Sequence, residues 1–552
     1  MKSQAPLAGL RSPSNCVRSA ELQSGDEHTS RMKPLSTAPG TATSTGGRTD
    51  AQPVAQPAGA LTASGKPVQK NVVLAVCCLS LFLVSMDSTI VNVALPSIRA
   101  DLHTGVSGQQ WTLDAYTLVL ASFLMLAGSS ADRLGRRRTF QTGLALFTAG
   151  SVLCSLAPGI GWLIGFRAVQ GLGGTMMNPV AMSIITNTFT DPRERSRAIG
   201  IWGAVVGISM AAGPLLGGLL TGAVGWRSIF WINAPIGLIA IVLAAVYVPE
   251  SRSEHARRVD PVGQVLVIVA LSSLIFALIE APRLGWGSPL TLAMVAAALL
   301  AVGGLLWYEP RREEPLIDLK FFRSVPFSSA ALGAVLAFLA FGSFLFLGSL
   351  YLQGARGFSA FQTGLTLLPT AAAMALLSPV SGLLVSRSGT RLPLVLAGTG
   401  ILASALLLTG LSATTPLWQL LLAYVLFGAG FGMVNAPITN TAVSGMPRSQ
   451  AGSAAAIAST SRQIGVSLGV ALSGTVVAGA LAGAAGAGSP AQAARLAQAT
   501  HAMWWVTALC GVCIVLLGVL SSTAWAKKSA ERVGQLLGDD RADGKTSSTA
   551  EA

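Results

Sequence analysis

Two acidic residues of this 552-residue chain lie where a proton carrier would be expected. Asp87 and Asp114 occur within long apolar runs, whereas residues 326–525 contain no Asp or Glu at all. An ionisable side chain in such surroundings is costly to keep and marks a functional site by default. Because burial and neighbouring charges change how readily a carboxyl group holds its proton, we predict that Asp87 carries a coupling proton and that Asp114 is a second candidate.

A basic residue in a later apolar run, Arg167, is the predicted partner of Asp87, either as its counter-charge or in a proton pathway. At a rise of 1.5 Å per residue, all three residues fall in the outer half of their runs. Two alternatives stay open. Asp87 and Arg167 could form a static ion pair that joins two helices. Asp114 lies close to Trp111 near a run's end and could be a solvated carboxylate at the membrane interface.

Membrane-spanning helices must position these side chains. Charged residues make up 11% of the chain, against roughly 25% in soluble domains, and the mean hydropathy is +0.61. Recurrent apolar runs have about the twenty residues needed to cross a hydrocarbon core about 30 Å thick. They lie at residues 72–95, 111–131, 140–157, 160–185, 198–221, 228–248, 262–280, 290–308, 326–352, 364–385, 393–411, 417–443, 452–481 and 503–525. The sequence therefore predicts an all-α polytopic membrane protein with 14 transmembrane helices.

Lys and Arg are distributed unevenly between the alternate loops. One set of loops, which includes those after the second, fourth and tenth runs, holds seventeen of these residues and the other set holds five. Cytoplasmic loops carry the excess of basic residues, so we expect the first set to face the cytoplasm. An even number of spans then places both termini in the cytoplasm, in a multi-pass protein of the cell membrane.

Two sequence patterns recur along the chain. Gly, Arg, Gly and Arg at 128, 133, 135 and 137 return at 382, 387, 389 and 391, an offset of 254. The segment from Gly171 to Asn178 returns from Gly428 to Asn435, an offset of 257. Runs one to six therefore correspond to runs nine to fourteen as a parallel repeat, with a substrate path between the halves.

This repeat predicts two six-helix halves with two inserted helices between them. The predicted parts are a disordered cytoplasmic tail (1–70), an N-terminal six-helix domain (71–250), two inserted helices with their loops (251–325), a C-terminal six-helix domain (326–526) and a cytoplasmic C-terminal tail (527–552).

The arrangement resembles the major facilitator superfamily, and the segment from Met86-Asp87 to Pro96 resembles its drug:proton antiporter family with fourteen transmembrane helices. Four further motifs carry the likeness: Gly128-x3-Asp132-Arg133-x-Gly135-Arg136-Arg137, Arg167-x2-Gln170-Gly171, Gly207-x5-Gly213-Pro214-x2-Gly217-Gly218, and Trp226-Arg227-x2-Phe230-x2-Asn233-x-Pro235. The resemblance implies proton-coupled export by alternating access.

The resemblance also implies roles for two of these motifs. The loop with Gly128, Asp132, Arg133, Gly135 and Arg136 would latch the two halves on the cytoplasmic side, on a tight turn that Gly135 permits. Its arginines could instead only anchor the cytoplasmic face. The run with Gly207, Gly213, Pro214 and Gly217 would be an antiporter signature. The small residues of this run, Gly203, Gly207 and Ala211 at steps of four and then Gly213 and Gly217, could also serve only close helix packing.

Three residues of the second half are candidates for a substrate cavity. Arg462 could contact an anionic or carbonyl-bearing substrate, or it could satisfy backbone carbonyls near the cytoplasmic end of its run. The offset of 257 aligns Tyr424 with Arg167 and Asn435 with Asn178. We expect this half mainly to shape the cavity, and the first half to carry proton coupling.

The predicted function is proton-coupled efflux of hydrophobic drugs or antibiotics. Gly544-Lys545-Thr546 lacks the earlier glycine of a phosphate-binding loop, and no cluster of His, acids or nucleophiles indicates an enzyme or a metal site. We expect a small-molecule substrate, protons and the lipid bilayer as partners, no nucleic acid, a monomer, and no cofactor besides the proton gradient. Export of an endogenous metabolite such as an amino acid or siderophore is the alternative, followed by a non-transport membrane protein.

Overall fold

A computed structural model describes residues 69–252, 260–312, 314–447, 450–481 and 490–548. These residues form helices joined by loops, and no β-strand occurs among them. The predicted N-terminal tail, residues 1–70, lies outside the described residues except for its last two positions.

The helices before residue 250 follow the first six predicted runs. They are α1 (Lys70–Asp101), α2 (Val106–Leu134), α3 (Arg136–Ser155), α4 (Ile160–Thr188), α5 (Pro192–Ala223), α6 (Ser228–Trp231) and α7 (Asn233–Tyr247). The sixth run is divided into α6 and α7 around Ile232.

The helices after residue 260 follow the remaining runs, except that α17 lies in the predicted C-terminal tail. They are α8 (Pro261–Leu284), α9 (Pro289–Tyr308), the short η1 (Glu309–Arg311) and η2 (Leu319–Arg323), α10 (Val325–Leu350) with its π-helical end η3 (Tyr351–Ala355), α11 (Ala360–Ser388), α12 (Arg391–Leu408), α13 (Leu417–Gly432), α14 (Asn435–Val443), α15 (Ala451–Leu481), α16 (Pro490–Ser521) and α17 (Ala524–Ser548).

Twelve helical segments of the described chain are long and apolar enough to cross a membrane. α3 and α4, of 20 and 29 residues, are not among them. α3 begins with three arginines, and the apolar sequence of α4 is interrupted by several glycines and by Arg167. The all-helical membrane architecture is thus confirmed, whereas the count of 14 transmembrane helices is not.

Side-chain caps and prolines fix where several helices begin. Asp191 accepts hydrogen bonds from the N–H groups of Arg193 and Glu194 at the start of α5. At the start of α11, Ser359 and Gln362 bond to each other's backbone as a capping box. Such caps satisfy backbone donors that have no partner within the helix.

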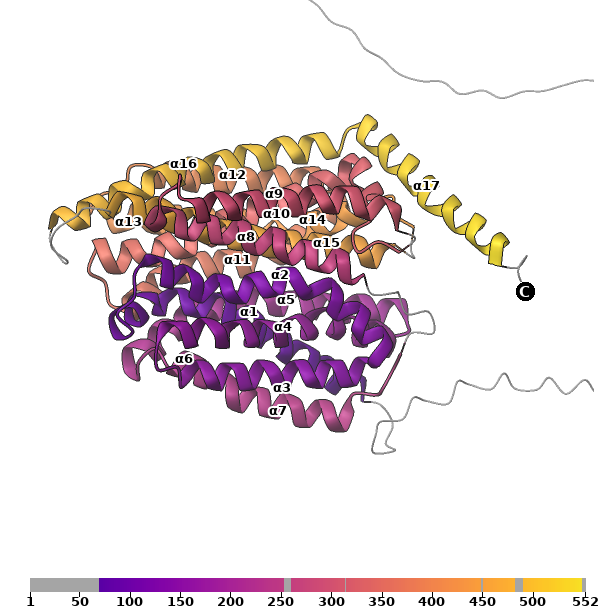
Figure 1. The fold of residues 1–552 in the computed structure, drawn as a ribbon, viewed down its shortest axis with the longest axis horizontal. Helices are drawn as coiled ribbons and strands as arrows, with labels where there is room; N and C mark the ends of the chain where they lie inside the picture. The colour runs from indigo at the N-terminus through magenta and orange to yellow at the C-terminus, as the bar shows by residue number, and fades with distance from the viewer. Residues whose placement is uncertain (1–68, 253–259, 313, 448–449, 482–489, 549–552) are drawn as a thin grey trace, which may run out of the picture. The chain divides into compact units, whose positions relative to one another are not determined.

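The helices gather into two bundles that pack in the same way. In the first, α1 packs against α4, α5 and α7, and α3 packs against α4 and α7. In the second, α10 packs against α14, α15 and α16, and α12 packs against α13 and α16. α1–α7, indigo to magenta, lie on one side, and α10–α16, salmon to yellow, lie on the other (Figure 1).

Equivalent glycine contacts occur in both bundles. A methyl group added at Gly171 in α4 would lie 2.9 Å from the carbonyl oxygen of Tyr116 in α2, and one at Gly428 in α13 would lie 2.2 Å from that of Thr370 in α11. Tyr116 and Thr370 are 254 positions apart, and the two glycines are 257 apart. The same close helix crossing is therefore built twice, as a parallel repeat requires.

Two crossed contacts join the bundles, α5 with α11 and α2 with α15. The inserted helix α8 packs against α2, α15 and α9, so it covers the second of these contacts. α17 packs against α10, η2 and α16 through a face that includes Ala526, Ala530 and Val533. The predicted domain boundaries stay predictions.

Candidate functional site

The carboxylate of Asp87 lies at the centre of a polar cluster inside the first bundle. Its side chain is fully buried. Oδ2 lies 2.5 Å from Nη1 of Arg167 in α4. Oδ1 accepts hydrogen bonds from Nε2 of Gln170 at 2.8 Å and from Nδ2 of Asn233 at 3.3 Å. The structure thus brings the predicted pair together, and it does so in the interior of one bundle.

The guanidinium of Arg167 is held from three further directions. Nε donates to the carbonyl oxygen of Thr112 in α2 at 3.0 Å, and Nη1 also donates to Oε1 of Gln170 at 2.7 Å. The guanidinium carbon lies 4.2 Å from the ring centroid of Tyr116, a cation–π distance. Nη2 is buried and has no hydrogen-bond partner among the described residues.

Sequence reasoning did not assign Gln170, Asn233 or Ser151 to this cluster, although the first two stand in motifs named above. Gln170 follows Arg167 by three residues and so shares its helix face. Asn233 begins α7, and its Nδ2 also lies 2.9 Å from Oγ of Ser151 in α3. Ser151 in turn donates to the carbonyl oxygen of Phe230 at 3.0 Å. Ser151 had no sequence signal, because a lone serine in an apolar run is common.

Asp114 lies elsewhere, between the two bundles. Its side chain is fully buried, so the predicted alternative of a solvated interfacial carboxylate is wrong. Oδ1 accepts from Oγ of Ser467 in α15 at 2.6 Å and from Oγ1 of Thr117 at 3.3 Å. Oδ2 has no hydrogen-bond partner among the described residues. Packing of α2 against α15 and α8 excludes water from this position.

The predicted latch loop makes contacts within the first bundle. Gly135 has a φ of +108°, the conformation that glycine permits in a tight turn. Asp132 forms an ion pair of 2.8 Å with Arg136 one turn later. The backbone N–H of Arg137 donates to Glu250 at 3.2 Å, which ties the loop to the segment after α7. Neither of these two contacts involves α10–α16.

The predicted signature in α5 is wedged between α1 and α11. A methyl group at Gly217 would lie 2.6 Å from the carbonyl oxygen of Ile90, and the carbonyl oxygen of Pro214 lies 2.5 Å from the methyl position of Gly364. Gly213 packs on α1 in the same way. The alternative of close helix packing therefore holds at Gly213 and Gly217. It does not hold at Gly203 and Gly207, because a methyl group at Gly203 would have no neighbouring atom within 4 Å and one at Gly207 only one, at 3.9 Å. Both of these glycines line a cavity.

That cavity, of about 2670 Å³, lies between the bundles. Its mouth includes Gly128 and Asp132 of the predicted latch loop and Gly382 of the repeated loop. At the opposite end the bundles are joined, because Ser349 donates to the carbonyl oxygen of Asn92 at 2.7 Å and Gln110 to that of Ala471 at 2.7 Å. Access is therefore from the end of the molecule that carries the arginine-rich loops.

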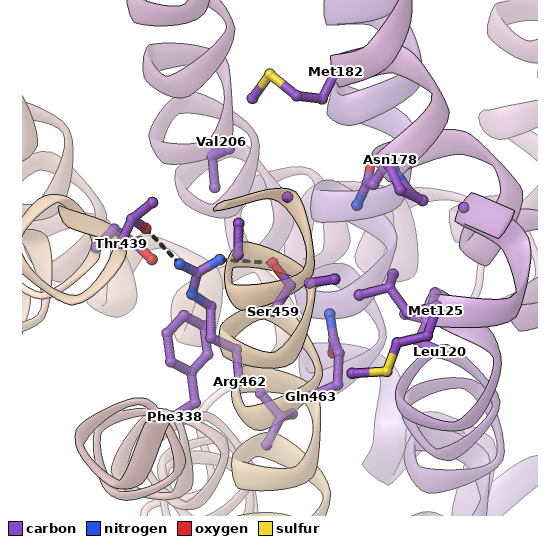
Figure 2. A pocket seen from close by; sticks show the side chains of 18 of the residues that line it. Leu120, Met125, Asn178, Met182, Val206, Phe338, Thr439, Ser459, Arg462 and Gln463 are labelled. Atoms are coloured by element: carbon purple, nitrogen blue, oxygen red, sulfur yellow. Dashed lines mark hydrogen bonds between the residues drawn. The ribbon is translucent and has the colours of Figure 1, made fainter. Parts of the chain in front are cut away.

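Two of the three predicted cavity residues do line this space. Arg462 and Asn435 belong to its wall. Arg462 donates to Oγ1 of Thr439 at 2.6 Å and to Oγ of Ser459 at 3.3 Å, so its hydrogen-bond partners among the described residues are side-chain hydroxyls and not backbone carbonyls (Figure 2). The prediction that Tyr424 lines the cavity is wrong, because this residue is 1% exposed and lies outside the cavity wall.

The position of Tyr424 has a structural explanation in the repeat. The offset of 257 takes Asp87 to Phe344, Arg167 to Tyr424 and Gln170 to Phe427. The Phe344 ring centroid lies 5.0 Å from that of Tyr424 and 4.0 Å from that of Phe427. The second bundle therefore has an aromatic cluster where the first has the acid, the guanidinium and the amide.

Comparison with known proteins agrees with this architecture. A family model described as the Major Facilitator Superfamily matches residues 77–470. The chain is 40% identical over 400 residues to the multidrug resistance protein Stp of Mycobacterium tuberculosis, covering 72% of this chain and 74% of that protein. It is 40% identical over 405 residues to the tetracenomycin C resistance and export protein of Streptomyces glaucescens, again covering 72% and 74%.

The fold is also similar to that of a solved structure. The crystal structure of the human organic anion transporter MFSD10 (TETRAN) aligns with a TM-score of 0.54 at 16% identity, covering 81% of this chain and 99% of that one. Together, the paired bundles, the cavity between them and these matches lead to one conclusion. The chain belongs to the major facilitator superfamily.

Proposed function

We propose that the protein is a proton-coupled antiporter that exports hydrophobic drugs or antibiotics by alternating access. The observation that carries this proposal is the fully buried carboxylate of Asp87, paired with Arg167 beside a cavity open at one end. Relatives named for multidrug resistance and for resistance to and export of tetracenomycin C support the choice of cargo.

Proton binding can be coupled to helix movement because residues of three helices meet at the carboxylate of Asp87. A proton on Asp87 removes its charge, so the salt bridge to Arg167 is lost and the amide donors of Gln170 and Asn233 face a neutral acid. These partners belong to α4 and α7, whereas Asp87 belongs to α1. Protonation therefore changes the preferred packing of three helices at once, and a two-state bundle can respond by moving.

Asp114 is proposed as a second coupling residue, at the contact between the bundles. Its hydrogen bond to Ser467 contributes to the closed end of the cavity. A buried charged carboxylate with one unpartnered oxygen is unstable, and a neutral one is much less so. Loss of its proton would accordingly weaken the α2–α15 contact, which must open when the cavity turns to the other side.

The topology proposed for this function has fourteen spans. α3 and α4 are about 30 and 44 Å long at 1.5 Å per residue, which suffices for a hydrocarbon core of about 30 Å. The arginine-rich loops then face the cytoplasm, with both termini, and the cavity is open to the cytoplasm. We propose a monomer in the cell membrane, with Asp132, Arg133 and Arg136 latching the halves when the cavity closes on that side.

Drug-susceptibility testing across a compound panel, in a host that lacks its own pumps, tests this function. The wild-type chain is expected to raise resistance to several compounds, and Asp87→Asn to abolish the increase, because an amide cannot carry the proton. Asp101→Asn is the matched control: it makes the same change on α1 at an exposed position, and resistance should persist.

Two outcomes of this panel would contradict the proposal. Unchanged resistance in Asp87→Asn would remove Asp87 from coupling. A wild-type chain that confers resistance to no compound would favour export of an endogenous metabolite.

A further inference from the structure

Arg462 presents an unusual charge to the cavity. It lies on α15 and lines the wall of the space between the bundles. Nη2 and Nη1 donate to the hydroxyl groups of Thr439 and Ser459, both of which are neutral. Nε is buried and has no hydrogen-bond partner among the described residues. Figure 2 shows the guanidinium between these two hydroxyls, beside the ring of Phe338.

No acid in the described part of the chain forms an ion pair with this guanidinium. Six ion pairs occur there, and Arg462 belongs to none. Its own half cannot supply a counter-charge, because residues 326–525 lack Asp and Glu. Across the cavity, Asp87 is bound to Arg167, and Asp114 is fully buried against Ser467.

The acidic residues of the cavity wall lie near its mouth, the end proposed above to face the cytoplasm, and basic residues lie among them. These charged residues are Asp132, Asp260, Glu309, Arg312, Glu314, Asp318, Lys320 and Arg323. Deeper in the cavity, the charged wall residues are Arg167, which is neutralised, and Arg462, which is not. An unpaired charge away from bulk water is unfavourable, so a ligand with a negative charge would stabilise this site.

The walls around Arg462 are apolar and aromatic. Phe338, Phe341 and Phe431 line the cavity on its own side, and the rings of Phe341 and Phe431 stack at a centroid distance of 4.4 Å. Met125 and Met182 line the opposite wall, from α2 and α4 (Figure 2). Methionine side chains adapt to differently shaped apolar ligands, and aromatic rings pack well against other rings.

We propose that this cavity preferentially takes amphipathic organic anions, meaning aromatic molecules with one carboxylate or phenolate group, and that Arg462 binds the anionic group. Thr439 and Ser459 hold the guanidinium in place, while the remaining N–H groups of Nη1 and Nη2 are available to the ligand. The inference rests on the proposed export function for the direction of transport, but not for binding.

Calorimetric titration of the purified full-length chain with three naphthalene probes tests the substrate class. The probes are 2-naphthoate, 2-naphthylmethanol and 2-naphthylmethylammonium, which share a ring system and differ in charge. The wild-type chain should bind the anion about tenfold or more tightly than the alcohol, the size expected for a hydrogen bond to a charged group, and the ammonium most weakly.

Variants at Arg462 then test the residue. Arg462→Gln should bring the affinity for naphthoate to within about twofold of that for the alcohol, leave alcohol binding nearly unchanged, and so remove the preference for the anion. Arg462→Lys should keep much of the preference, because it keeps the charge but loses the planar donor group. Arg387→Gln is the matched control, since it removes one arginine at an exposed position outside the cavity wall, and its binding should equal that of the wild type.

The outcomes separate this inference from the proposed function. The inference would be overturned if the wild type bound the ammonium most tightly, or if the preference for the anion survived in Arg462→Gln. The ranking of the three probes by the wild type decides the substrate class even if a variant fails to fold. Proton-driven export of cationic probes alone from proteoliposomes would overturn the inference and leave the export function standing. An anion preference without proton-driven transport would leave the inference standing and overturn the proposed export function.

Discussion

At the scale of residues, Asp87 and Arg167 carry opposite charges, and both side chains are fully buried. Removing one partner of such a pair leaves a buried charge uncompensated, which costs about 3–5 kcal/mol, whereas replacing both can be nearly neutral. A pair that serves stability is costly to replace as a whole, whereas a pair that serves coupling can be replaced as a whole with little loss of stability but with loss of transport.

We expect Arg167→Gln alone to lower the stability of the purified protein strongly, by several degrees or more in its unfolding midpoint. The double variant Asp87→Asn with Arg167→Gln should recover most of that loss, because no unpaired charge remains, yet it should show no proton-driven transport. Thermal unfolding and vesicle transport of the two single variants and the double variant measure both effects. If the double variant lost as much stability as the two single variants summed, the charges would not be acting as a pair.

The pair itself could be predicted from the sequence, because few charged residues fall inside apolar runs. Its amide partners could not, since Gln170 and Asn233 resemble many polar residues that helices tolerate. Tyr424 shows a different limit. The repeat gives the correct equivalent position, in contact with Phe344 as Arg167 contacts Asp87. It does not reveal that large neighbouring rings fill the space around that position.

At the scale of elements, α5 shows that small residues serve two purposes along one helix. Gly213 and Gly217 pack closely against α1, whereas Gly203 and Gly207 border open space in the cavity. The four-residue spacing of the glycines could not separate these purposes, because it fixes a helix face but not what lies opposite that face. The positions of the long helices from α1 to α16, by contrast, were predictable from the apolar runs.

Gly217→Ala should destabilise the protein by about 1–3 kcal/mol, since the new methyl group would meet a backbone carbonyl oxygen of α1, which cannot move without the helix. Gly203→Ala, in the same helix, is the control and should be neutral or slightly stabilising, because alanine favours a helix over glycine. Thermal unfolding midpoints of both variants test this. Equal losses at the two positions would show that α1 and α5 are not in close contact there.

At the scale of the whole molecule, the bundles meet at one end and separate at the other. Hydrogen bonds from Ser349 to Asn92 and from Gln353 to Val93 join α10 and η3 to α1 at the closed end. The distribution of arginines predicted which end faces the cytoplasm, but not which end is open, because that depends on the balance between two packings of the same helices.

In a cysteine-free background, Ser88→Cys should react with a membrane-impermeant maleimide applied to inverted vesicles, because Ser88 lines the cavity. The same reagent applied to intact cells should react little. Ser349→Cys, fully buried at the closed end, should be protected in both preparations and serves as the control. Labelling of Ser88→Cys only from outside the cell would reverse the proposed orientation.

The aromatic cluster of Phe344, Tyr424 and Phe427 has a consequence for how such a transporter can evolve. In the proposed mechanism only the first bundle holds the proton-binding group, Asp87, and the second bundle has packed aromatic rings at the equivalent positions. Substitutions around Phe338, Phe431 and Arg462 can then alter which molecules are exported without changing the residues proposed for proton coupling. New resistance should therefore arise by mutation mainly in the second half of the chain, while the first half stays under constraint.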